Sequence, residues 1–173
     1  DELSRLTDKP VKTIIYTHGH PDHRGGGGAF RDTVEEIIAF APKKAVLKGT
    51  DRINPILNKR TFRQFGYGLT DEELITQGLG IREGHAIGDG VYSFLPPATL
   101  YTEDSVIRTI DGVTFEMVSA VGETDDQIFL WLPGERIMCC GDNYYGCWPN
   151  LYAIRGGQYR DIAAWVDSLE RIR

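Results

Sequence analysis

The chain has 173 residues, of which 41% are hydrophobic, so it can bury one ordinary core, and a single domain over residues 1–173 is expected. Its formal net charge of −6 at pH 7 argues against a nucleic-acid groove or an anionic membrane surface as the partner. No run approaches the roughly 18 consecutive apolar residues that a membrane-spanning helix needs.

The first half of the chain alternates predicted strands and helices. Residues 11–17 are apolar and β-branched, which indicates a short buried strand. Residues 30–40 have apolar side chains at helical spacing and are followed by Pro42, which predicts a helix. Residues 44–48 are predicted as a strand and residues 51–65 as a helix.

From residue 102 onward the pattern changes to strands joined by tight turns. Four predicted strands form two hairpins, at residues 105–110, 113–120, 127–132 and 136–140. Asp111-Gly112 is a strong signal for a two-residue turn, and Pro133-Gly134 separates the second pair in the same way. Residues 160–173 have the pattern of an amphipathic helix. This order favours an α/β fold with helices packed on mixed sheets.

The cysteines and the two ends of the chain leave the cellular compartment open. Three cysteines, two of them adjacent (Cys139 and Cys140), form no disulfide framework and lack the spacing of a thiolate zinc site. We interpret them as small core residues. The chain begins with Asp1, without a basic-then-apolar signal segment, and its last helix has no Gly or Asn cap. We therefore expect it to be part of a longer polypeptide.

Three of the four histidines lie within six residues, directly after the first predicted strand. His18, His20 and His23, with Asp22 among them, offer imidazole nitrogens and a carboxylate, which are ligands that zinc prefers. A loop leaving the strand would turn His18 and His20 toward one metal ion, and Asp22 and His23 toward a second. The glycines at 25–28 let the backbone pass close to such a site. The alternative is a solvated polar loop with incidental histidines.

The segment Thr17-His-Gly-His-Pro-Asp-His23 resembles the H-x-H-x-D-H signature of the metallo-β-lactamase superfamily. The resemblance implies an αββα sandwich, of which this chain would be an incomplete portion, with metal ions at one edge between two mixed sheets. It also implies a third ligand at Glu123 and a bridging carboxylate at Asp142, each following a later strand. The alternative for Glu123 is a surface carboxylate in an acidic turn, and for Asp142 an Asx-type turn residue.

Within this superfamily the chain is similar to the alkyl sulfatases. Most members have a histidine where Glu123 stands, whereas the alkyl sulfatases have a glutamate there. Their second acidic residue follows 19 positions later, which is the interval between Glu123 and Asp142, although it is usually a glutamate. Further short matches include Arg60-x-Phe62-x-Gln-Phe-Gly66 and Asn150-Leu-Tyr-x-x-Arg155-Gly.

This likeness implies a sulfate-ester site beside two zinc ions. Two zinc ions would lower the pKa of a bound water from about 15.7 toward 7, and Asp22 would help to orient it. Asn150 and Arg155 stand where alkyl sulfatases bind the sulfate group, and a guanidinium fork matches two oxygens of a tetrahedral oxyanion. Arg63 and Tyr67 lie in the helix region where the family supplies a tyrosine to the sulfate.

The predicted function is zinc-dependent hydrolysis of a small anionic ester, an alkyl sulfate, with S–O and C–O cleavage both open. One alternative is a carboxylic or thioester hydrolase on the same metals, in which Arg155 would bind a carboxylate. Another is a non-catalytic metal-binding module, against which the retained histidine motif argues. From the residues alone, Arg155 is also open to capping the following helix or pairing with Asp161.

The superfamily gives its second zinc a further histidine from a strand that follows the bridging carboxylate. The remaining histidine, His85, lies upstream of both Glu123 and Asp142 and cannot fill that position. The fold also normally begins with several strands before the one that precedes the histidine motif. We therefore expect the remainder of the same polypeptide to complete the site. Whether the protein forms a homodimer is left open.

Overall fold

The computed structural model of the chain describes residues 3–44, 52–70, 72–73, 91–144, 146–153, 156 and 159–173. Two compact units make up the chain. The first consists of Asp1–Lys44, Tyr92–Pro149 and Arg160–Arg173, and the second of Ala45–Val91 and Asn150–Tyr159. All strands of the described residues belong to the first unit, whereas helix α2 (Asn54–Gln64) belongs to the second.

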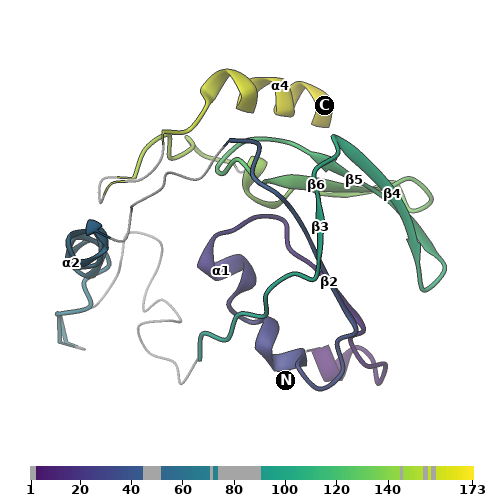
Figure 1. Ribbon diagram of the computed structural model, residues 1–173, viewed down its shortest axis with the longest axis horizontal. Coiled ribbons are helices and arrows are strands. Elements are labelled where there is room, and N and C mark those ends of the chain that lie inside the picture. Colours follow the sequence, from purple (N-terminus) through teal and green to yellow (C-terminus); the bar gives the residue numbers. More distant parts are fainter. Residues whose placement is uncertain are drawn as a thin grey trace. The chain divides into compact units, whose positions relative to one another are not determined.

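The described strands form two sheets (Figure 1). The first is parallel, in the order β1-β2-β3, with strands Thr13–Ile15, Glu36–Phe40 and Thr99–Tyr101. The second is antiparallel, in the order β4-β5-β6-β7, with strands Ser105–Ile110, Val113–Ser119, Ile128–Leu132 and Ile137–Cys139. Among these strands neither sheet mixes directions, whereas the resemblance implied two mixed sheets.

The helix predicted over residues 30–40 is wrong, because residues 36–40 form the central strand β2 of the first sheet. Ile38 and Phe40 face the second sheet, while Ile37 packs in a cluster on the other face. A strand covered on both faces carries a continuous apolar run in place of strict alternation, and here that run coincided with helical spacing.

The first hairpin has the predicted turn and the second does not. Ile110 pairs with Val113, so Asp111 (φ 50°) and Gly112 (φ 80°) form a two-residue turn in the left-handed region that such turns require. In the second hairpin Leu132 pairs with Ile137, and four residues, 133–136, connect the strands. Proline has a fixed negative φ and cannot occupy the first position of that two-residue turn.

The two sheets pack face to face around one apolar cluster. Its buried members come from β2, β5 and β6 and are Ile38, Phe40, Phe115, Met117 and Ile128. On the outer face of the first sheet, Tyr16 and Ile37 pack with Leu95, which lies in the segment leading to β3. The sheets therefore form the two inner layers expected of an αββα sandwich.

Helix α4 (Ile162–Ile172) covers the outer face of the second sheet and confirms the helix predicted over residues 160–173 (Figure 1). Its Ile172 packs with Val118 and Phe129 of that sheet. Asp161 caps its first turn by accepting a hydrogen bond from the Ala164 backbone N–H at 3.1 Å.

The remaining short helices of the described residues are η1 (Leu3–Arg5), α1 (Pro21–Arg24), η2 (Gly27–Phe30) and η4 (Gly141–Asn143). Helix α2 confirms the helix predicted over residues 51–65, and β1 confirms the strand predicted over residues 11–17. None of the described helices is long and apolar enough to cross a membrane. The interpretation of all three cysteines as core residues is wrong, because Cys139 on the edge strand β7 and Cys147 are exposed.

Candidate metal centre

His18 lies where the chain passes from the first sheet to the second. After β1, the Tyr16 N–H still donates to the Ile38 oxygen of the first sheet at 2.9 Å. One residue later, the Thr17 backbone carbonyl oxygen accepts from the Ile128 N–H of the second sheet, also at 2.9 Å. His18 is therefore held at the edge between the two sheets, and only 2% of it is exposed.

The other side chains of the cluster come from three segments around His18. Helix α1 begins at Pro21, directly after His20, and carries Asp22 and His23. Proline is well suited to a first helical position, because its missing N–H would have no intrahelical partner there. Glu123 lies in the connection between β5 and β6, and Asp142 lies in η4, which follows β7.

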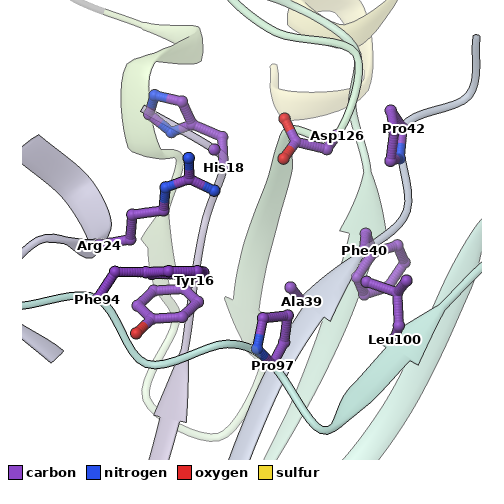
Figure 2. A pocket seen from close by; sticks show the side chains of 11 residues that line it. Tyr16, His18, Arg24, Ala39, Phe40, Pro42, Phe94, Pro97, Leu100 and Asp126 are labelled. Carbon is purple, nitrogen blue, oxygen red and sulfur yellow. The ribbon is translucent and has the colours of Figure 1, made fainter. Parts of the chain in front are cut away.

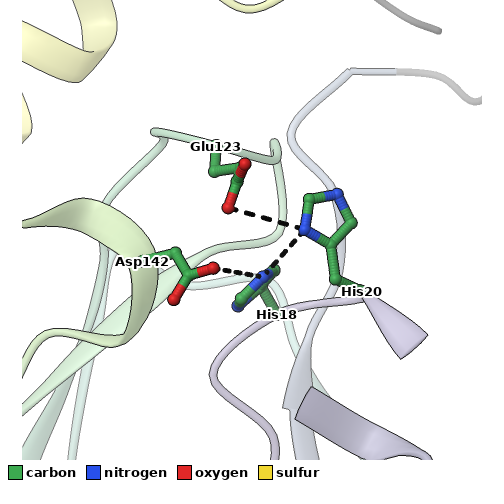
Figure 3. Close-up of side chains that lie close together, drawn as sticks. All are labelled: His18, His20, Glu123 and Asp142. Carbon is green, nitrogen blue, oxygen red and sulfur yellow. Dashed lines mark hydrogen bonds and ion pairs between the residues drawn. The ribbon is translucent and has the colours of Figure 1, made fainter. Parts of the chain in front are cut away.

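Two imidazoles and two carboxylates converge in this cluster, as Figure 3 shows. His18 Nε2 lies 3.1 Å from His20 Nδ1, and His20 Nδ1 lies 3.6 Å from Glu123 Oε2. His18 Nε2 also lies 3.8 Å from Asp142 Oδ2. Each of the four residues offers one donor atom, and these atoms all lie within 4.8 Å of one another. A single metal ion can therefore lie at ordinary metal–ligand distances from all four atoms.

His23 joins the cluster through Asp142. The His23 Nε2 atom lies 3.1 Å from Asp142 Oδ2 and 3.4 Å from Asp22 Oδ2. Asp142 therefore lies between His18 on one side and His23 on the other, which is the place expected of a bridging carboxylate. The Asp22 side chain is 77% exposed, and His23 is its contact with the cluster.

The electrostatics of the cluster suit a cation. Burial, with the neighbouring His23 and His20, lowers the pKa of His18 to about 4, so that its imidazole is neutral at pH 7. Burial acts to raise the pKa of Glu123, but hydrogen bonding within the cluster outweighs it and lowers that pKa to about 2. Burial and the nearby Glu123 carboxylate raise the pKa of Asp142. The two carboxylates of Glu123 and Asp142 repel each other, and a cation between them would relieve this repulsion.

The surroundings of the His18 Nδ1 atom also fit metal binding. Its Nδ1 lies 3.2 Å from the Thr17 hydroxyl, which can accept a hydrogen bond from Nδ1–H and leave the Nε2 lone pair directed at the cluster. Nitrogen and oxygen donors of this kind suit zinc. The residues present therefore fit a divalent ion.

Two neighbours of the cluster were not predicted from the sequence. Arg160 Nη2 lies 2.6 Å from Glu123 Oε1, and its side chain is 10% exposed. Gln127 is fully buried, and with its amide oxygen facing η4 it accepts from the Asp142 N–H at 2.9 Å. No motif marks either residue, because their contacts join segments that are distant in the sequence.

The residues predicted to bind a sulfate group lie in the second unit. Arg63 is in the last turn of α2, and Tyr67 follows that helix, with its ring centroid 5.8 Å from that of Phe65. Asn150 Oδ1 accepts from the Tyr152 N–H at 3.2 Å, in a local turn. Arg155 lies outside the described residues. The sulfate-binding role of this group stays a prediction.

A pocket of about 160 Å³ adjoins His18 within the first unit (Figure 2). Its wall is mainly apolar, with Phe40 and Phe94 among the lining residues, and Arg24 and Asp126 supply the charges. The Arg24 guanidinium lies over the Phe94 ring, 4.6 Å from its centroid. The pocket gives the buried side of His18 a mixed apolar and charged surrounding.

A profile of the Metallo-beta-lactamase superfamily matches residues 1–173. The chain belongs to this superfamily. It is 32% identical to "Linear primary-alkylsulfatase" of Pseudomonas sp. (strain ATCC 19151), over 99% of this chain and 34% of that protein. It is 30% identical to "Alkyl/aryl-sulfatase BDS1" of Saccharomyces cerevisiae, over 95% of this chain and 26% of that protein. The chain thus spans about a third or less of these two relatives.

Solved structures support the superfamily fold. The stereoselective inverting sec-alkylsulfatase Pisa1 from Pseudomonas sp. matches with a TM-score of 0.73 and 20% identity, over 98% of this chain and 28% of that one. A metallo-beta-lactamase family protein from Thermus thermophilus matches with a TM-score of 0.61 and 21% identity, over 98% of this chain and 54% of that one.

Proposed function

We propose that residues 1–173 are the metal-binding catalytic portion of a zinc-dependent hydrolase of organic sulfate esters. The observation that carries this proposal is the convergence of His18, His20, Glu123 and Asp142 donor atoms within 4.8 Å. A glutamate at this position is the feature that resembles the alkyl sulfatases, and the 32% identity to a linear primary-alkylsulfatase supports the same substrate class.

Two zinc ions would be held by this chain's donors. His18, His20 and Glu123 would hold the first ion, Asp22 and His23 the second, and Asp142 would contact both. When bound, the zinc ions supply Lewis-acid chemistry that makes water a nucleophile near neutral pH. Asp22, exposed beside His23, would orient that water and accept its proton.

The substrate would be held by the side chains of Asn150, Arg155, Arg63 and Tyr67. Arg155 would bind two oxygens of the sulfate group through its planar fork, and Asn150 would donate its amide to a third. Arg63 and Tyr67 would contribute further donors to the anionic head. These groups orient the ester, and both S–O and C–O cleavage are compatible with them.

The test uses the full-length polypeptide, with zinc measured by elemental analysis and sulfate release measured with dodecyl sulfate. We expect two zinc ions for each polypeptide, and loss of sulfate release after chelation with recovery on adding zinc. A long-chain thioester serves as the comparison substrate. Turnover of the thioester without sulfate release would contradict the proposed substrate class, and full sulfate release from zinc-free protein would contradict the proposed metal.

A further inference from the structure

Arg160 contacts a carboxylate oxygen that does not face the histidines. Its Nη2 lies 2.6 Å from Glu123 Oε1, while Glu123 Oε2 lies 3.6 Å from His20 Nδ1. The Arg160 and Glu123 side chains are 10% and 12% exposed. The two oxygens of Glu123 therefore have different partners. The contact with Arg160 is a short, largely buried and charge-assisted hydrogen bond, which is a strong type.

The position of Arg160 is fixed by the start of helix α4. Asp161, the next residue, caps the helix through the Ala164 N–H and also lies 2.9 Å from the Lys44 ammonium. The cap and the ion pair hold the backbone on which Arg160 stands. Arg160 lies directly before this capped helix start, outside the helix itself, and its guanidinium reaches Glu123 from there.

The same helix holds the segments that carry both carboxylates of the cluster. The Ser168 hydroxyl donates to the Val121 oxygen at 2.7 Å, two residues before Glu123. The Trp165 indole N–H donates to the backbone carbonyl oxygen of Asn143, the residue after Asp142, at 3.0 Å. Helix α4 thus links the Glu123 segment to η4, and Arg160 extends this support to the Glu123 side chain itself.

We infer that Arg160 is a positioning residue of the metal centre: it holds Glu123 Oε1, leaves Oε2 as the single ligand atom, and offsets part of the carboxylate charge. This inference rests on the proposed ligand role of Glu123. A buried ion pair is by itself weak evidence for stability, because desolvation opposes the attraction between the charges. An outer partner that orients a ligand, in contrast, changes the affinity of the metal.

The test compares Arg160→Met with Arg171→Met in the full-length polypeptide. Both changes remove a guanidinium from the α4 region, but Arg171 donates to the Ser119 backbone oxygen at 2.8 Å. Zinc affinity is measured by competition with a chromophoric chelator, and the zinc-free variants are compared by thermal unfolding. We expect zinc binding at one site to weaken about 10- to 100-fold in Arg160→Met and to change by less than about 2-fold in Arg171→Met.

Cobalt substitution gives a spectroscopic measurement of the same effect. Without Arg160, Glu123 Oε1 is released and can also reach the ion, because carboxylates bind ions through one or two oxygens. We therefore expect the visible absorption of the cobalt-loaded Arg160→Met variant to differ from wild type, and that of Arg171→Met to match it. Arg160→Lys, which keeps a cation beside Glu123, is expected to bind zinc with intermediate affinity, and it replaces Arg160→Met if that variant does not fold.

Glu123→Gln distinguishes failure of this inference from failure of the proposed function. If Glu123→Gln binds zinc as the wild type does, the ligand role of Glu123 fails and the role of Arg160 fails with it. If Glu123→Gln weakens zinc binding while the Arg160 variants bind zinc as Arg171→Met does, only the positioning role is overturned. Weaker zinc binding in both Glu123→Gln and the Arg160 variants supports the inference.

Discussion

Asp142 lies between two histidines of the cluster, 3.8 Å from His18 Nε2 and 3.1 Å from His23 Nε2. If it contacts both zinc ions, Asp142→Asn should weaken binding of both, because an amide oxygen keeps the shape but loses the charge. We expect zinc affinity to fall at least about 10-fold, the lower end of the effect of removing an outer partner. Zinc titration of the full-length polypeptide measures this change.

Asp104→Asn is the matched control for this prediction, because the Asp104 side chain is 90% exposed and pairs with Lys43. It should leave zinc binding unchanged. Loss of affinity for a single ion in Asp142→Asn would show that Asp142 serves one ion and does not bridge.

The residues of the site differ in how far the sequence could predict them. His18, His20, His23 and Asp22 stand close together after a strand, so their spacing alone indicates a metal site. Glu123 and Asp142 belong to acidic and turn-like sequence contexts, and only the resemblance to a family singled them out. Arg160 was missed because its contact with Glu123 arises from the packing of α4 on the second sheet, which no local pattern describes.

At the level of elements, Arg108 connects the two sheets through an ion pair with Glu36 and a hydrogen bond to Tyr101. Arg108 of β4 donates to both Glu36 carboxylate oxygens, at 2.9 and 3.3 Å, and to the Tyr101 hydroxyl at 2.6 Å. Glu36 lies in β2 and Tyr101 in β3, so the guanidinium joins β4 of the second sheet to two strands of the first. The hydrogen bond from Arg108 is the main cause that lowers the pKa of Glu36 below its ordinary value of 4.5.

This lowered pKa predicts a pH-dependent contribution to stability. The ionised Glu36 stabilises the fold at pH values above 4.5, and the contribution is lost as the pH falls through the lower pKa of the folded state. Because 30% of the Glu36 side chain is exposed, solvent screening limits the effect to about 1 kcal/mol. Glu36→Gln should therefore unfold at lower urea concentration than wild type at pH 7, and the difference should shrink below pH 4.5.

Glu35→Gln is the control, because Glu35 precedes Glu36 in the chain, pairs with Lys12 and has a side chain that is 70% exposed. Its effect should stay within a few tenths of a kcal/mol at both pH values. A difference between wild type and Glu36→Gln that does not change with pH would contradict the role given to the Glu36 charge.

The elements show where local pattern reaches its limit. The Asp111-Gly112 turn was predictable because its backbone conformation is required by two adjacent residues. Strand β2 was not, because burial on both faces depends on a second sheet and on the segment around Leu95, both far along the chain. The strand predicted over residues 44–48 lies outside the described residues except for Lys44. His85 also lies outside them.

For the whole molecule, the superfamily and the two-sheet architecture were predictable because one short motif identifies a fold that then accounts for the distant segments. The activity of the whole protein was not, since the chain covers 34% of one alkylsulfatase relative and 26% of another. The expectation that a later histidine from the same polypeptide completes the second zinc site stays a prediction.

Under the proposed function, Arg155 is the residue that would distinguish a sulfate ester from an uncharged ester, because it would bind the sulfate oxygens. Arg155→Lys keeps the charge but loses the planar fork, and one hydrogen bond to a charged group contributes about 1.5–3 kcal/mol. We therefore expect kcat/KM for dodecyl sulfate to fall roughly 10- to 150-fold in the full-length polypeptide. Hydrolysis of an uncharged ester with the same alkyl chain should change little, as should both reactions in Arg31→Lys, an exposed surface control. Equal loss on the charged and uncharged esters would mean that Arg155 supports the fold and does not bind the sulfate group.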